Sequence, residues 1–295
     1  MKKKLEKLEK YWILYDVGNS AFALLLSTII PIYFKNMAAA AGIANADSTA
    51  YLSYAISIST VIVAILGPVL GAVADHKNRK KPLFTFFMMM GVLGCACLAL
   101  PSGIIAFLAV FVIAKVGFSG SLIFYDSMLV DVTTDERMDE VSSQGFAWGY
   151  IGSCVPFVIS LGLILGADQI GLSGTAAMMI AFAINAAWWG LVTIPLLRNY
   201  KQNYYVESKG HITAKQSLSQ LAEIFGEIRN DRKVLLFLLS FFFYIDGVYT
   251  IIEMATSYGK DVGISDTSLL LALLLTQIVA FPCAILFGKL TKQFE

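Results

Sequence analysis

The sequence predicts an all-α membrane protein, and three observations carry that prediction. Of its 295 residues, 57% are hydrophobic and 15% are charged, whereas soluble domains are about half apolar and about a quarter charged. Several apolar runs are long enough to cross ~30 Å of hydrocarbon, which takes about 20 helical residues. Lysine and arginine are concentrated in alternate connecting segments. Because backbone in lipid must form its hydrogen bonds internally, these runs are expected to be helices.

The apolar runs number eight and leave short polar segments between them. They cover residues 11–34, 51–74, 83–100, 103–125, 146–167, 175–197, 234–254 and 267–288. If the N-terminus is inside, every lysine and arginine except Lys35, Lys115 and Lys260 lies in an inner segment. Cytoplasmic loops carry the excess of positive charge. We therefore predict a multi-pass protein of the cell (plasma or inner) membrane, with a cytoplasmic N-terminus, membrane lipid as a partner and no nucleic-acid contact.

A polar, basic segment divides the runs into two groups. Residues 1–198 predict an N-terminal six-helix bundle, 199–233 a cytoplasmic linker, and 234–295 the first two helices of a C-terminal bundle. Within the linker, apolar residues at spacings of three and four predict an amphipathic surface helix over 214–228. A weak repeat relates Tyr15-Asp16 of the first run to Tyr244-Ile245-Asp246 of the seventh. Such internal similarity is typical of transporters built from two similar halves, and on this interpretation we expect the second half to lack about four spans.

The segment after the second run combines small residues, an aspartate and a group of cations. Gly71, Asp75 and Arg79 follow one another at intervals of four and so share a helix face. We predict that they and Lys80 form a conformational latch, in which Asp131 at the inner end of the fourth run pairs with Arg79 or Lys80. The alternative is a plain positive-inside loop beside a glycine that lets a neighbouring helix come close.

Charged residues inside apolar runs are the candidates for a substrate or proton pathway, because a charge in lipid is costly unless it is paired or faces water. The candidates are Asp16, Asn19, Lys115, Asp126 and Asp246.

Each candidate except Asp246 has an alternative interpretation. Asp16 and Asp126 lie near the inner interface, where headgroup water would solvate them, and Lys115 could form a structural ion pair with a carboxylate of another helix. The Asn19 amide could serve helix packing. Glu253 is interpreted as the outer end of the seventh helix.

Five segments carry a family resemblance: residues 12–22, 124–129, 145–152, 194–198 and 244–248. They resemble the unknown major facilitators, a branch of the major facilitator superfamily similar to the autophagy-related vacuolar amino-acid effluxers. The resemblance implies a major facilitator fold, truncated to about eight of twelve helices, that works by alternating access. It departs at Val17, Asp126 and Val130, where the family more often has tryptophan, asparagine and proline.

The sequence and the resemblance together predict a secondary active transporter of small solutes, with amino-acid efflux as the substrate hypothesis and proton coupling through the buried carboxylates. The alternative function is a non-transporting membrane scaffold or assembly subunit. An enzyme is not expected, because the two histidines, His76 and His211, lie in loops and no nucleophilic or metal-ligand spacing accompanies them. We expect no cofactor and no metal.

Overall fold

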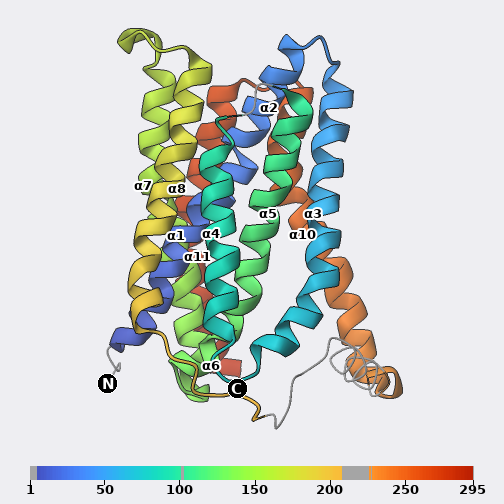
Figure 1. Cartoon of the computed structure of the whole chain (residues 1–295), viewed down its shortest axis with the longest axis vertical. Coiled ribbons are helices and arrows are strands. Elements are labelled where there is room, and N and C mark those ends of the chain that lie inside the picture. Colours follow the sequence, from blue (N-terminus) through green and yellow to red (C-terminus); the bar gives the residue numbers. More distant parts are fainter. Residues whose placement is uncertain (1–4, 101–102, 208–225, 227, 295) are drawn as a thin grey trace.

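The computed structural model describes residues 5–100, 103–207, 226 and 228–294, and within them it confirms the all-helical membrane architecture (Figure 1). Eight helical segments are long and apolar enough to span a membrane. The helices are α1 (Lys7–Ser27), α2 (Ile29–Ala40), α3 (Asn45–Ala74), α4 (Lys80–Cys97), α5 (Ile104–Ser127), α6 (Leu129–Val132), α7 (Met138–Leu165), α8 (Gly174–Asn199), α10 (Arg232–Asp261) and α11 (Asp266–Phe294). Two short 3₁₀ turns, η1 (Asp135–Arg137) and η2 (Asp168–Ile170), precede α7 and α8.

The two ends of the bundle are named here by their residues. The Asp131 end carries the start of α1, the α3–α4 loop, α6 and the end of α8. The Asp261 end carries α2, the start of α3 and the α10–α11 loop. The sequence predicts that the Asp131 end faces the cytoplasm.

The first span is two helices, because α1 stops at Ser27 and α2 begins at Ile29. Pro31 has no N–H, so it cannot donate to the carbonyl four residues before it, that of Ser27. The Thr256 hydroxyl of α10 donates to this Ser27 carbonyl instead. A carbonyl freed inside the membrane therefore gains its hydrogen bond from another span, as lipid-embedded backbone requires.

Close backbone approach holds α4 against α5. A Cβ atom added at Gly117 would lie 2.3 Å from the backbone nitrogen of Gly91, and one added at Gly94 would lie 2.7 Å from Cα of Ala114. Small residues at such a crossing replace the hydrophobic effect, which lipid does not supply, by van der Waals contact. Large aromatic side chains, among them Trp189 and Phe22, fill the space between these helices and α1 and α8.

The last two spans differ in how they contact the rest. Helix α11 packs along α7, where Trp148 and Phe281 lie edge to face with ring centroids 5.9 Å apart and a Cβ at Gly288 would touch Ser143. Helix α10 has none of its most apolar window buried, and near the Asp131 end it stands apart from the labelled helices α4, α7 and α8 in Figure 1. It extends to Asp261, beyond the predicted limit at residue 254.

The division into two bundles and a linker stays a prediction. The expected amphipathic helix at 214–228 lies outside the described residues except for its positions 226 and 228.

Candidate functional site

Asp16 lies in the middle of α1 and faces a glycine-lined part of α7. A Cβ at Gly145 would lie 3.2 Å from the Asp16 Oδ2 atom, and one at Gly149 would lie 3.4 Å from its Cγ. Only 8% of Asp16 is exposed, and it has no hydrogen bond or ion pair with any residue that the structure describes. The helix–helix contact thus leaves one carboxylate buried and without a partner.

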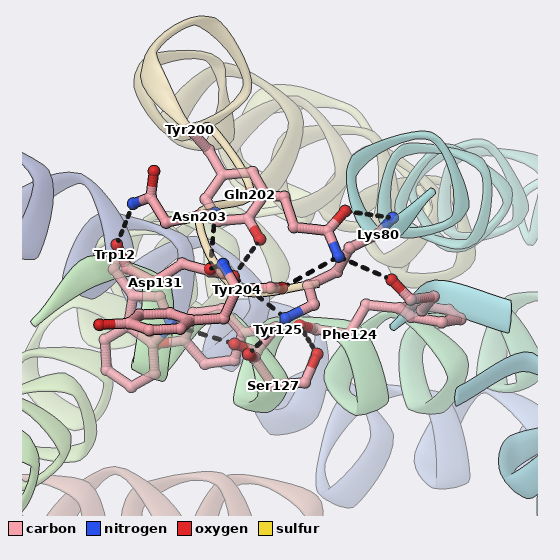
Figure 2. Close-up of polar contacts among 11 residues, drawn as sticks. Trp12, Lys80, Phe124, Tyr125, Ser127, Asp131, Tyr200, Gln202, Asn203 and Tyr204 are labelled. Atoms are coloured by element: carbon pink, nitrogen blue, oxygen red, sulfur yellow. Dashed lines mark hydrogen bonds and ion pairs between the residues drawn. The ribbon is translucent and has the colours of Figure 1, made fainter. Parts of the chain in front are cut away.

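Aromatic side chains of α1 and α5 surround Asp16. Trp12 stacks on Tyr125, with centroids 4.3 Å apart, and its Nε1 donates to the Tyr125 carbonyl at 3.1 Å (Figure 2). Tyr15 shares a 2.6 Å hydrogen bond with Ser121. These contacts fix the position of α1 against α5, and therefore the position of Asp16 relative to Asp126.

Asp16 and three residues of other helices form what we name the central cluster: Asp16 of α1, Asp126 of α5, Tyr150 of α7 and Tyr249 of α10. Asp126 follows Tyr125, whose ring centroid lies 4.6 Å from that of Tyr15, the neighbour of Asp16. Tyr150 follows Gly149, where an added Cβ would lie 3.4 Å from Asp16 Cγ, and Tyr249 lies one turn before Glu253 on α10. Asp126 and Tyr249 are exposed, whereas Asp16 is buried.

Lys115 of α5 is paired with Glu253 of α10. The ammonium group is 5% exposed and the carboxylate 23%. This contact supports the alternative interpretation, that Lys115 forms an ion pair with another helix. The interpretation of Glu253 as a helix end is wrong, because α10 continues for two more turns and buries most of this carboxylate against α5.

The other two predicted pathway residues are Asp246, which has no hydrogen bond or ion pair among the described residues, and Asn19, whose side chain lies beside the Tyr15 hydroxyl. Asp246 is exposed on α10, seven residues before Glu253 and therefore on the same helix face. Asn19 is buried, and its Nδ2 atom lacks a hydrogen-bond partner in the described part of the chain. The structure thus places Asp16 and Asp126 next to the α1–α5 contact of Trp12 with Tyr125, and Asp246 lies three residues before Tyr249 on α10.

A second polar site lies at the Asp131 end (Figure 2). Asp131 accepts hydrogen bonds from Lys80 Nζ at 3.0 Å, from the Tyr200 hydroxyl at 2.6 Å, and from the backbone N–H groups of Asn203 and Tyr204, both at 2.8 Å. Its side chain is 0% exposed and that of Lys80 is 3% exposed. Burial, together with the hydrogen bond to Asp131, raises the pKa of Tyr200. Residues 200–204, which follow α8, are therefore held on α6.

The remaining residues of the predicted latch are placed differently. Asp75 and Arg79 are exposed, so Lys80 and not Arg79 pairs with Asp131. A Cβ at Gly71 would meet nothing within 4 Å. The close helix approach expected at Gly71 is therefore absent among the described residues. Pro68 lies inside α3 just before Gly71, and in Figure 1 the lower part of α3 is inclined to its upper part.

Contacts that the sequence did not predict close the Asp261 end. Lys35 of α2 pairs with Asp261 of α10 and donates to the Ser257 carbonyl at 2.9 Å. Thr49 of α3 donates to the other Asp261 oxygen at 2.9 Å. Lys35 is buried, so this ion pair ties α10 to the first two spans.

A second buried ion pair that sequence reasoning missed lies near the start of α1. Glu9 accepts from Arg137 Nη2 at 2.8 Å and from Thr133 at 2.7 Å. The described residues contain no group of three His, Cys, Asp or Glu side chains of the kind that holds a metal ion.

The profile of a family described as vacuole effluxer Atg22 like matches residues 6–137 and 130–295. The chain is 48% identical over 299 aligned residues to the uncharacterized MFS-type transporter YxiO of Bacillus subtilis, covering all of this chain and 70% of that protein. An uncharacterized protein of Aquifex aeolicus is 29% identical over 254 residues, which is 84% of this chain and 56% of that protein.

Proposed function

Because the chain belongs to the vacuole effluxer Atg22-like family of major facilitator transporters, we propose that it carries a small solute across the membrane by alternating access. The observation that supports this most is the unequal contact of α10 with the first three spans. Among the described residues, α10 forms its hydrogen bonds and ion pairs with these three spans through residues in the half near the Asp261 end. They are Met254, Thr256, Ser257, Lys260 and Asp261. The half nearer the Asp131 end is largely exposed.

In this proposal the two ends of the bundle open in turn. The contacts of Lys35 with Asp261 and Ser257 close the Asp261 end, and the central cluster is reached from the Asp131 end. Rocking of α10 about its contacts would break the Lys35–Asp261 pair and admit the solute from the other side. The Lys115–Glu253 pair joins α5 to α10 near the middle and would change in the same motion.

The Asp131 end is the proposed site of the latch. The Lys80–Asp131 pair is its buried part, and Asp75 and Arg79 are exposed beside it. Exposed charges at this position are free to contact residues that approach when the Asp131 end closes. Gly71 would give the helix end room to move, because no side chain packs on it.

The finer features of the proposal are substrate, coupling and orientation. The family description supports efflux, and we propose an amino acid as the solute. Asp16, Asp126 and Asp246 are the residues proposed to take up a coupling proton, because they carry no ion pair among the described residues. The charge distribution supports a cytoplasmic Asp131 end in the cell membrane.

Solute counterflow in proteoliposomes tests the transport proposal. Vesicles containing the full-length protein are loaded with a mixture of unlabelled amino acids, and the entry of each labelled amino acid is measured. We expect entry of at least one amino acid to exceed that into protein-free vesicles, and to fall when Asp16→Asn is introduced. Counterflow of no amino acid would contradict the amino-acid hypothesis. Counterflow that Asp16→Asn and Asp126→Asn leave unchanged would contradict the assignment of the pathway.

A further inference from the structure

The central cluster has an excess of negative charge that the described residues do not neutralise. Lys115, the cation in the middle of α5, is already paired with Glu253. Asp16 and Asp126 have no ion pair among the described residues. Two carboxylates that share a membrane site without a cation are costly. A proton or another cation from outside the described chain would neutralise the cluster.

A buried, unpartnered hydroxyl group adds an independent observation. Tyr125 is 3% exposed, and its hydroxyl has no hydrogen-bond partner in the described part of the protein. The ring is held by its stacking on Trp12, which lies one turn before Asp16 on α1. Native structures leave few buried polar groups unpaired. This one adds an unsatisfied hydrogen-bonding group beside the two carboxylates.

We propose that the central cluster binds the ammonium group of an organic amine, with Asp16 and Asp126 as its anionic partners and Tyr150 and Tyr249 as aromatic walls. The proposal rests on the transport function proposed above and specifies the substrate class of that site. An ammonium group offers donors to carboxylate and hydroxyl oxygens, and these charge-assisted bonds are the strong ones. Aromatic faces attract the same cation.

The paired state of Lys115 makes the site selective against anions. A carboxylate on the solute would have to compete with Glu253 for the ammonium group of Lys115, and it would be repelled by Asp16 and Asp126. We therefore expect an amine to bind more tightly than the corresponding amino acid, and an amino acid more tightly than the corresponding acid. An amino acid remains a substrate through its own ammonium group.

Binding of three matched probes to the purified full-length protein tests this order. The probes are 3-methylbutylamine, leucine and 4-methylpentanoate, which share a branched chain and differ in their charged groups. Isothermal titration calorimetry in detergent micelles is expected to give the tightest binding for the amine and none for the acid. Asp16→Asn and Asp126→Asn should each weaken amine binding about 10-fold or more, the factor of a charge-assisted hydrogen bond.

Asp168→Asn is the matched control, because Asp168 is exposed in η2 and far along the chain from the cluster. It should bind the amine like the unmodified protein. Asp126 is exposed, so Asp126→Asn should fold normally even if Asp16→Asn does not. Acid binding equal to amine binding, no amine binding, or amine binding unchanged in Asp126→Asn would overturn the inference.

The outcomes separate this inference from the transport proposal. Counterflow of an amino acid with no preference for the amine would overturn the ammonium site and leave transport standing. Amine binding that depends on Asp126, without counterflow of any of the three probes or of any amino acid, would overturn transport and leave the binding site standing.

Discussion

Substitution of Asp131 by alanine should destabilise the protein by about 3–5 kcal/mol, the usual cost of removing one partner of a buried ion pair. The carboxylate is fully buried and accepts four hydrogen bonds, from Lys80, Tyr200, Asn203 and Tyr204. Without it, the one hydrogen bond that the buried ammonium of Lys80 keeps among the described residues is that to the Ser127 carbonyl, at 2.9 Å. Equilibrium unfolding in detergent micelles measures this loss.

The matched control is Asp75→Ala, which removes an exposed carboxylate at the same end of the bundle and should change stability by less than about 0.5 kcal/mol. A double-mutant cycle with Lys80→Met separates the pair from its surroundings. Replacing both partners should cost clearly less than the sum of the two single changes. Equal destabilisation by Asp131→Ala and Asp75→Ala, or strict additivity in the cycle, would refute the assignment.

Three further predictions concern single contacts. Tyr200→Phe should cost about 1–2 kcal/mol. Because the pKa of Tyr200 is raised in the folded protein, its contribution is complete below pH about 10 and is lost at higher pH. Unfolding free energies from pH 8 to 11 should therefore fall less in Tyr200→Phe. Gly117→Ala should destabilise by a few kcal/mol through overpacking against Gly91, whereas Gly162→Ala, which meets open space, should not lower the unfolding temperature. Thr256→Val, which leaves the Ser27 carbonyl unpaired, should cost about 1 kcal/mol in the same unfolding assay.

The membrane-spanning helices were predictable from the sequence because hydrocarbon thickness sets the length of an apolar run. All eight predicted runs correspond to spans of the structure. The ends were less predictable. The seventh run was expected to stop at residue 254, but Glu253 is paired within the bundle, and the helix continues to Asp261.

The polar contacts of the candidate site were predictable only in part. The pairing of Asp131 with Lys80, the first residue of α4, was predictable because both charges lie at the same membrane surface. The pairs Lys35–Asp261 and Lys115–Glu253 join residues more than 130 positions apart, and no local pattern indicates which helices will meet. Residues 200–204 show no motif, because much of their attachment to Asp131 uses backbone N–H groups.

Which glycines lie at close helix contacts was also only partly predictable from the sequence. Gly71 and Gly117 both precede a small or apolar neighbour in an apolar run, yet a Cβ would clash at Gly117 and meet open space at Gly71. The sequence indicates that a close approach is allowed, and only the arrangement of the helices decides whether it occurs.

The most direct test of alternating access measures from which side of the membrane the central cluster can be reached. Tyr249→Cys, in a variant without the four native cysteines, places one thiol at an exposed position of the cluster. We predict that a membrane-impermeant maleimide labels it from the Asp131 side, and that adding Asp261→Asn increases labelling from the opposite side. Labelling from both sides or from neither side would contradict the account if Asp261→Asn left that labelling unchanged.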